Sequence, residues 1–550
     1  MNSEPLAEGY YLANFCAVLE DVEARCGDLL LVEECALLAR FRTLPLAAQR
    51  LYVRMLTRKG PWFRQEQLSY PEIGDPGPAI EVLRREGFCL AAPELQDLLP
   101  LLIRSDLIEE LADAGFVLPK GARREDLLAL LQASMDEPIL QERLELRLRP
   151  VSPGLEQLWR RIFLMYFGNF EQDLATFVVA DTGRVRFEAY PVDPRLRPFE
   201  ARSDVDYLLS IRSLREQLET VSSAAELEVL TATALAMESH PGIRPQRRFQ
   251  RLLNELGRGW ERAGDSGKAV ACYTRSERPP ARERRVRILA CGGDLDAACR
   301  LAMELAEAPR DVSESRFAMA FLERHRRKVT AVEPWLQAHP GPEPPVEIRL
   351  DLPRHPGGVE RAVLEAARGA GWEGFFAENQ LWRALFGLLF WEELFADVSG
   401  AFQHRFQNAP LDIGEADFYW KRESLIDRRL ATLARCQNLP DLLLGMADAK
   451  WGVANAFVDW RHLQRGQLAE ALARIPVEVL DAVLRLMLRN PRAFDSGFPD
   501  LFLYRPEAQA WKLWEVKGPG DSLRPEQDWW LRQFARLGCE ARVVRVRYND

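Results

Sequence analysis

The chain has 550 residues, more than one hydrophobic core usually contains, so we expect several domains. Hydrophobic residues account for 47% and charged residues for 28%, as in water-soluble globular proteins. No apolar run reaches the roughly 18 residues of a membrane span, and the N-terminus lacks the basic and apolar segments of a secretory signal. The nine cysteines form no C-x-x-C pair, which argues against zinc ribbons and disulfide scaffolds. We therefore expect a cytoplasmic, reducing location, and no membrane partner.

The net charge is −9, which argues against a molecule that binds polyanions over its whole surface. Of the 73 basic residues, 65 are arginines and eight are lysines. Such a ratio is typical of a GC-rich genome. It also means that any surface facing phosphate would consist of arginine forks, which bind phosphate oxygens in pairs. A lysine inside a chemical motif is therefore notable in this chain.

Apolar spacing predicts a helical region over residues 1–75. At the end of this region basic residues are interleaved with aromatic ones, namely Arg54, Arg58, Lys59, Trp62, Phe63 and Arg64. Such a mixture is typical of a DNA-binding surface. A solvated helix face followed by a turn at Gly60-Pro61 is an equally good interpretation.

Residues 76–149 contain a helix, a turn and a second helix between positions 98 and 133. We expect the two helices to pack through Leu107, Ile108 and Leu111 against Leu127, Leu128 and Leu131. Lys120, Arg123 and Arg124 lie at the start of the second helix. The pattern resembles a SAP-type DNA-binding hairpin, although helical hairpins are common.

Residues 150–358 are rich in leucine and alanine and almost free of strand signals. Positions 257–273 resemble a tetratricopeptide helix pair, with a generic helical domain as the alternative; the matching residues are Gly257, Trp260, Gly264, Ala269, Ala271 and Tyr273. Arginines cluster at 244–251, 275–287 and 324–328, either as solvated faces or as a groove for an anionic backbone. Seven prolines in 331–358 predict the main domain boundary.

The C-terminal region contains two short strands, 501–504 and 511–517, separated by the turn RPEAQA. A hairpin symmetric about this turn pairs Tyr504 with Trp511 and Phe502 with Leu513, so Asp500 faces Glu515. Side chains two apart share a face, which brings Lys517 to the same side.

Two carboxylates this close repel each other unless a cation lies between them. Ligand sets built only from oxygen select Mg²⁺ or Mn²⁺. Such an ion can polarise a phosphate oxygen and acidify a bound water. A neighbouring lysine can orient that water and stabilise the charge that develops on phosphorus.

The residues Pro499-Asp500 and Glu515-Val516-Lys517 match the PD-(D/E)xK nuclease signature. The wider text, from Gly497 to Asp500 and from Glu515 through Asp521 and Leu523 to Gln527, resembles the VRR-NUC nuclease domain. The resemblance implies catalytic roles for Asp500, Glu515, Lys517 and Gln527. We expect the helix that starts near Pro525 to pack on the sheet with Gln527 aimed at the site, and VRVRY to form another strand.

Residues 374–395 are apolar almost all round and predict one buried helix with Glu378 in its first turn. From the residues alone, Glu378 complements the helix dipole. The stretches 377–391 and 410–422 nevertheless resemble the Fanconi-associated nuclease family. In that family a glutamate of this helix is a metal ligand.

The resemblance covers the whole chain and is sharp over 374–550, within the nuclease domain expected at 359–550. It implies a multidomain, mostly α-helical fold with a C-terminal α/β nuclease domain, acting as a monomer on DNA. It also implies a structure-selective, metal-dependent DNA nuclease that cuts near 5′ flaps and trims in the 5′-to-3′ direction in interstrand-crosslink repair. The zinc finger that binds ubiquitin in eukaryotic members has no Cys/His counterpart here.

By the same resemblance, two ions, Mg²⁺ or Mn²⁺, would be held by Glu378, Asp500, Glu515 and the backbone carbonyl of Val516. A basic pocket would hold the 5′-terminal phosphate, with Arg282 as the first candidate, Arg285 next and Arg492 third. A basic position of the family falls on Glu526 here. The alternatives are a DNA-binding adapter with an inactive nuclease domain and a resolvase of the Holliday-junction type.

Overall fold

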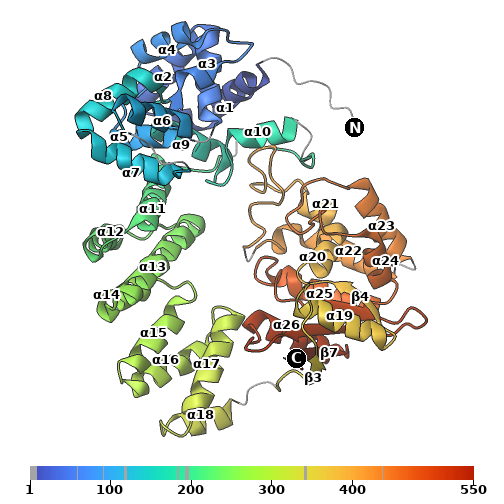
Figure 1. Cartoon of the computed structure of the whole chain (residues 1–550). Helices are drawn as coiled ribbons and strands as arrows, with labels where there is room; N and C mark the ends of the chain where they lie inside the picture. The colour runs from blue at the N-terminus through green and yellow to red at the C-terminus, as the bar shows by residue number, and fades with distance from the viewer. Residues whose placement is uncertain are drawn as a thin grey trace. The chain divides into compact units, whose positions relative to one another are not determined.

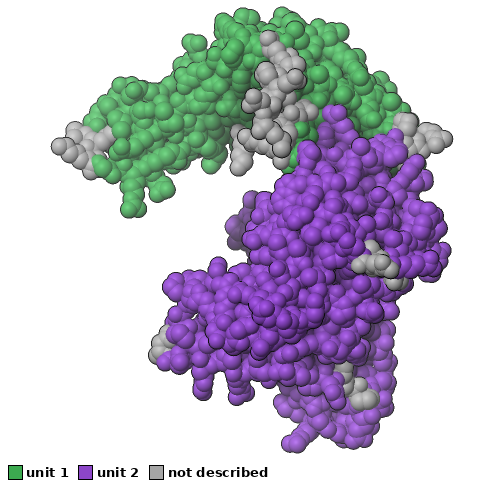
Figure 2. Space-filling view, turned by 90° about the vertical axis from the view of Figure 1, so that its right-hand side faces the viewer, with its two compact units in different colours: residues 1–185, 194–205 green, residues 186–193, 206–550 purple. Residues whose placement is uncertain are grey.

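The computed structural model describes residues 9–549, except 59, 91, 117–120, 182–184, 193–196, 340–342, 416 and 436–437. The chain forms two compact units, coloured separately in Figure 2. The first contains residues 1–185 and 194–205, and the second contains residues 186–193 and 206–550. None of the described helices is long and apolar enough to cross a membrane.

The first unit is helical around an aromatic core. Phe15, Phe41, Tyr52, Phe88 and Trp159 contact one another there, and the Tyr52 hydroxyl donates a 2.7 Å hydrogen bond to the Gly154 carbonyl. The elements of this part are α1 (Tyr10–Cys26), α2 (Val32–Thr43), α3 (Leu46–Leu56), β1 (Phe63–Arg64), α4 (Pro76–Arg85), β2 (Pro150–Val151), α9 (Glu156–Phe167) and α10 (Leu174–Asp181).

Most of the basic and aromatic residues at 54–64 have partners within the fold, whereas Arg58 is exposed and donates to the Gln67 carbonyl and the Tyr70 hydroxyl; the expected DNA surface stays a prediction. Arg64 is buried and forms an ion pair with Asp106 of a later helix. Trp62 and Phe63 are buried as well. Arg54 bonds Glu72, 18 residues further along the chain. Lys59 lies outside the described residues. A run of charges does not reveal partners that the fold supplies from elsewhere.

The expected helical hairpin consists of α6 (Arg104–Asp113) and α7 (Arg124–Ser134), packed with α5 (Leu95–Leu98), the short helix η3 (Leu99–Leu101) and α8 (Glu137–Leu148). Leu107, Leu111, Leu127 and Leu131 are buried as predicted. Ile108 is 38% exposed, so its place in the expected core is wrong; the helix turns it outward.

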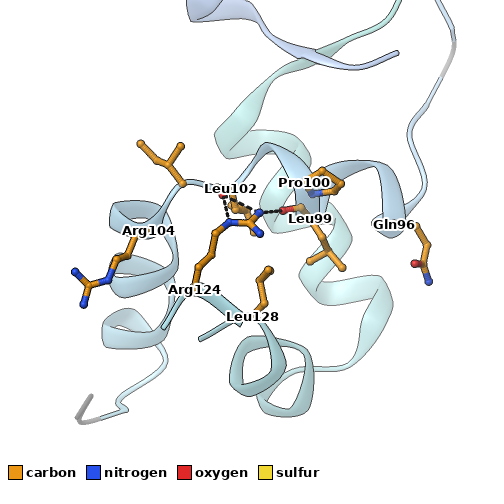
Figure 3. A pocket seen from close by; sticks show the side chains of 8 residues that line it. Gln96, Leu99, Pro100, Leu102, Arg104, Arg124 and Leu128 are labelled. Atoms are coloured by element: carbon orange, nitrogen blue, oxygen red, sulfur yellow. Dashed lines mark hydrogen bonds between the residues drawn. The ribbon is translucent and has the colours of Figure 1, made fainter. Parts of the chain in front are cut away.

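The arginine that opens α7 is exposed, but its guanidinium bonds to backbone carbonyls of the preceding segment. Figure 3 shows the Arg124 guanidinium bonded to the carbonyls of Leu99 and Leu102, at 3.2 Å each. Arg104 points away from this contact. Lys120 lies outside the described residues.

In the second unit, successive antiparallel helix pairs follow α11 (Arg202–Thr220). Gly257 is required where α13 crosses α14, because a Cβ atom would lie 2.7 Å from the Tyr273 ring. Trp260, Ala269 and Tyr273 are buried, whereas Ala271 is exposed. The helices are α12 (Ala224–Ala236), α13 (Ile243–Ala263), α14 (Ser266–Thr274), α15 (Ala281–Cys291), α16 (Leu295–Glu307), α17 (Val312–His325) and α18 (Val332–Ala338).

A five-stranded sheet follows in the order β3-β7-β6-β5-β4. Its strands are β3 (Glu347–Leu352), β4 (Glu373–Phe376), β5 (Leu501–Tyr504), β6 (Trp511–Lys517) and β7 (Ala541–Tyr548). β7 is parallel to β3 and β6, and the other pairs are antiparallel. α19 (Val359–Gly369) covers one face of the sheet, and α20 (Leu381–Leu389) and α26 (Pro525–Arg536) cover the other (Figure 1).

Strand β3 moves the start of the nuclease sheet upstream of the boundary expected at residue 358. It pairs with β7 over six residues, and the dense prolines end before and resume after it. The chain divides into two compact units, and the finer division into four domains stays a prediction.

The single helix expected over 374–395 is wrong. Residues 373–376 form β4, which pairs with β5, and the helical part begins at Leu381 and continues in α21 (Trp391–Leu394). Phe375 stacks on Phe502 of the neighbouring strand, and Gly374 allows the close approach of Leu503. A segment that is apolar at nearly every position shows neither the periodicity of a strand nor that of a helix, so its sequence does not distinguish the two.

Between β4 and β5 the chain forms a helical insertion that packs on the same core as α20. Its helices are η4 (Trp420–Arg422), α22 (Glu423–Arg435), α23 (Leu439–Ala449), α24 (Arg465–Leu472) and α25 (Val477–Arg489). α25 leads directly into the loop that ends at Asp500.

Candidate active site

The hairpin of β5 and β6 has the predicted register. Tyr504 pairs with Trp511, and Phe502 pairs with Leu513. Continued by one residue beyond Leu501 and Trp514, the same register places Asp500 opposite Glu515. The backbone N–H of Val516 donates a 2.7 Å hydrogen bond to Oδ2 of Asp500, which fixes this carboxylate at the end of β6.

Lys517 and Glu515 share one face of β6. The Lys517 Nζ lies 2.5 Å from Oε1 of Glu515, and both side chains are buried. The second oxygen of Glu515, Oε2, is buried and has no hydrogen-bond partner among the described residues. Such an oxygen needs a proton or a cation, since an unpaired buried charge costs free energy.

Burial raises the proton affinity of both carboxyl groups. Burial is the main cause that raises the pKa of Asp500 to about 6, and the charge of Glu378 adds to it. Burial and the charge of Asp500 raise the pKa of Glu515 to about 8, against the lowering effect of Lys517. A cation between the two carboxylates would offset the free-energy cost of burying their charges and would reduce the repulsion between them.

Glu378 lies in the connection between β4 and α20 and not in the first turn of a helix, so the helix-dipole interpretation is wrong. Both neighbours of Glu378 are held against the Asp500 loop, Ala377 through its backbone and Asn379 through its side chain. The Ala377 N–H donates to the Asp500 carbonyl at 2.8 Å, and the Gly497 N–H donates to Asn379 Oδ1 at 2.9 Å. The Glu378 side chain is exposed and accepts a 3.2 Å hydrogen bond from Asn379.

The carboxylates of this site are suitable ligands for a divalent metal, but their side chains do not form a complete coordination shell. Among the described residues, no three histidine, cysteine, aspartate or glutamate side chains converge on one point. Asp500 and Glu515 face each other, and Glu515 keeps an unused buried oxygen. Glu378 is near enough for its charge to raise the pKa of both.

Gln527 is buried in the first turn of α26, as expected for a residue next to the sheet. Its Oε1 accepts a 3.0 Å hydrogen bond from the Arg524 N–H, which caps the helix. Gly497 lies against this turn, where a Cβ atom would be 2.9 Å from the Gln527 nitrogen. The helix N-terminus and the Asp500 loop are therefore in close contact.

One acidic residue near the site was missed in the sequence. Glu360, in the first turn of α19, carries a charge that raises the pKa of Asp500. It occupies the position where carboxylates commonly favour a helix N-terminus, so no sequence signal separates it from an ordinary helix start.

The arginines expected to bind phosphate have different surroundings. The Arg282 Nε donates a 3.0 Å hydrogen bond to buried Glu314, and its Nη2 donates to the Ala308 carbonyl at 2.9 Å. No described residue forms a hydrogen bond or ion pair with Arg285, which is half-buried. Arg492 is 45% exposed in its side chain and lies 3.7 Å from Asp495; burial and Arg383 hold the pKa of Arg492 below its usual range.

Charged groups of both signs lie near Glu526. Burial raises the pKa of Asp311, and the charges of Glu314 and Glu526 raise it further. Burial lowers the pKa of Arg316 and the charge of Glu526 opposes that shift, so this position has both carboxylates and a guanidinium nearby.

Comparisons with known proteins agree with this geometry. Residues 9–90 match the family model "FAN1, HTH domain", and residues 437–548 match the model "VRR-NUC domain". The chain is 34% identical to the Fanconi-associated nuclease 1 homolog of Pseudomonas aeruginosa, over 100% of this chain and 98% of the relative. It is 24% identical to human Fanconi-associated nuclease 1, over 98% of this chain and 62% of the relative.

The crystal structure of paFAN1 bound to 5′-flap DNA with a 2-nucleotide flap and a gap matches with a TM-score of 0.85. The sequence identity is 32%, and the match covers 100% of both chains. A second structure, with a 1-nucleotide flap, has a TM-score of 0.84 and covers 98% of this chain and 99% of the other. The chain belongs to the Fanconi-associated nuclease family, structure-selective DNA nucleases whose VRR-NUC domain hydrolyses phosphodiester bonds with divalent metal ions.

Proposed function

We propose that this enzyme cuts DNA near 5′ flaps and trims in the 5′-to-3′ direction, as a monomer that serves interstrand-crosslink repair in the bacterial cytoplasm. The observation that carries the proposal is the convergence of Asp500, Glu515 and Lys517 at one end of the β5–β6 hairpin. The bound 5′-flap DNA of the two matching structures supports the choice of substrate.

In this proposal Asp500, Glu515 and the Val516 carbonyl hold Mg²⁺ or Mn²⁺. The N–H and C=O of one strand residue point to the same side. Because the Val516 N–H donates to Asp500, its carbonyl faces the same edge, beyond the first residue of β5. Glu378 completes the ligand set by turning inward from its exposed position, which a short connection between β4 and α20 allows. Two ions would be shared by the three carboxylates.

The bound ions would supply Lewis-acid chemistry and an acidified water. The Lys517 side chain lies beside Glu515, where it would orient the attacking water and stabilise charge on the phosphate oxygens. Gln527 positions the loop through the α26 cap, and its amide nitrogen is available for the same water. Burial of these groups excludes bulk solvent from the reaction.

For the 5′-terminal phosphate, the surroundings favour Arg285 and Arg492 over Arg282. Arg282 would have to leave Glu314 and the Ala308 carbonyl before it could bind phosphate. Arg285 has no such partner among the described residues, and Arg492 lies on the loop that leads to Asp500. A pocket of this kind would set the distance from the DNA end to the ions.

Cleavage of a labelled 5′-flap and of a matched unbranched duplex, with Mn²⁺, Mg²⁺ or EDTA, tests the proposal. We expect cuts close to the flap junction that need the metal and are much slower on the unbranched duplex. Binding without cleavage under every condition would favour the inactive adapter. Symmetric paired cuts in a four-way junction would favour the resolvase.

A further inference from the structure

A cavity in the helical insertion between β4 and β5 lies beside the turn that opens α22, and none of the active-site carboxylates lines it. Its volume is about 360 Å³, within the range of about 300–1,000 Å³ typical of ligand pockets. It is lined by Tyr419, Trp420, Leu430, Arg485, Leu488 and Arg489.

The turn is held rigidly on both sides of an exposed indole. Phe418 is buried, and Arg422 is buried in a two-pronged ion pair with Asp412, at 2.8 and 3.1 Å. The Arg422 Nε also donates to the Glu393 carbonyl at 3.0 Å. Trp420, between these two anchors, is 66% exposed. A fixed backbone that presents a large apolar ring to solvent is typical of a binding surface.

Two arginines give the cavity its charge. Arg485 donates from Nε to Asp481 at 2.7 Å and remains half exposed. No described residue forms a hydrogen bond or ion pair with Arg489, which is exposed at the end of α25. None of the lining residues is acidic. Flat aromatic surface beside an unpaired guanidinium complements a planar ring that carries a phosphate.

We propose that this cavity binds one unpaired nucleotide of the DNA substrate, with its base stacked on Trp420 and its phosphate at Arg489. The inference rests on the proposed function. Stacking on an aromatic side chain requires an exposed base face, which a paired duplex hides and a single-stranded flap offers. The contact tolerates every base, because each has a π face.

The location connects the cavity to the reaction. Arg489 is the last residue of α25, and the chain runs from there through a single loop to Asp500. A nucleotide held at Arg489 would therefore be bound by the segment that delivers the metal-binding carboxylate. The site would sense whether an unpaired strand is present next to the scissile bond.

Fluorescence of 2-aminopurine tests the inference. The probe replaces one flap base at a time in a 5′-flap substrate, with the full-length protein in EDTA so that no cleavage occurs. We expect wild type to quench the probe at one or two adjacent flap positions. Trp420→Ala should abolish the quench and weaken flap binding about 5- to 140-fold, the range that corresponds to the loss of one stacked base. Trp420→Phe should keep most of both.

Trp451→Ala is the matched control, because Trp451 is 44% exposed, belongs to the same helical insertion and does not line the cavity. It should leave the quench unchanged. Arg489→Gln should reduce the salt dependence of flap binding by about one phosphate contact, and Arg461→Gln, with an 83% exposed side chain, should not.

Equal quenching by wild type and Trp420→Ala would overturn the inference, as would equal losses in Trp420→Ala and Trp451→Ala. A change of oligomeric state in Trp420→Ala would instead assign the surface to a second copy of the chain. Failure of the proposed function is a separate readout, since it would appear as no flap cleavage by wild type with Mn²⁺.

Discussion

The β5–β6 hairpin and the arginine-rich helices were both expected from the sequence to carry function. The hairpin has the expected geometry, whereas a key arginine of the helices is engaged in an ion pair within the fold. In the hairpin, the register expected from a symmetric turn is the register observed, and Asp500, Glu515 and Lys517 meet as predicted. In the helices, Arg282 is held by Glu314, 32 residues away. A motif set by local strand geometry can be predicted from adjacent residues, whereas the availability of a charge depends on partners that only the tertiary structure supplies.

The largest expected effects fall on the hairpin. Asp500→Ala, Glu515→Ala and Lys517→Ala should each reduce cleavage at least ~10³-fold, since each removes a metal ligand or the group that orients water. DNA affinity should stay within a few-fold, because it comes from phosphate contacts spread over other regions. Rates on a labelled flap and binding without metal measure the two quantities.

Lys512→Met is the matched control for Lys517→Ala, because Lys512 lies on the opposite face of the same strand, between Trp372 and Trp514. We expect it to keep the cleavage rate even if it lowers the melting temperature. Normal cleavage by Lys517→Ala would contradict the assignment of the site.

Glu378→Gln should reduce activity by about 10²-fold or more, with little change in melting temperature. Its side chain is exposed and forms no helix cap, so its loss should cost little stability. If Glu378 is a ligand, the Mn²⁺ concentration for half-maximal activity should also rise. Asn379→Asp, beside it, is unsuitable as a control because Asn379 holds Gly497; Glu373→Gln on β4 is suitable.

The pH dependence should separate a metal site from a structural ion pair. Folded-state pKa values of about 6 for Asp500 and about 8 for Glu515 lie above the usual values, so burial favours the protonated forms. Without metal, the protein should therefore lose stability as pH rises from about 4 through 8. Metal must displace these protons, so its apparent affinity should increase up to about tenfold per pH unit for each proton displaced over that window.

Thermal unfolding with and without Mn²⁺ at pH 6 and 8 measures this effect. The stabilisation by Mn²⁺ should be larger at pH 8. A metal effect that is equal at the two pH values, or absent in wild type, would show that these carboxylates do not hold the ion.

The smallest expected effect concerns the helices. Arg282→Ala leaves Glu314, which is 1% exposed, without its ion-pair partner, and should cost roughly 2–3 kcal/mol of stability, less than a fully buried pair because Arg282 is partly exposed. Arg285→Ala should cost little stability.

Wild type should cut 5′-phosphorylated flaps several-fold faster than 5′-hydroxyl flaps. When rates are compared at equal concentrations of folded protein, Arg285→Ala should reduce that preference more than Arg282→Ala. The opposite ranking would restore Arg282 as the phosphate ligand.

Predictions of secondary structure from the sequence were most accurate where the apolar residues followed a single periodicity, either that of a strand or that of a helix. Alternation over 511–517 and the spacing of Leu107, Leu111, Leu127 and Leu131 placed a strand and a hairpin correctly. The segment 374–395 carried no such signal, since it is apolar in every direction, and β4 exists because β5 offers it an edge. Glu360 and the inward-facing Arg64 could not be predicted, because their neighbours come from distant parts of the chain.

Anomalous diffraction from crystals of the enzyme with Mn²⁺ and an uncut 5′-flap DNA tests the central claim most directly. We expect manganese between Asp500 and Glu515, with the Val516 carbonyl and an inward-turned Glu378 among the ligands and Lys517 beside the bound water. Manganese elsewhere, with Glu515 still paired only to Lys517 and no ion at Asp500, would contradict it.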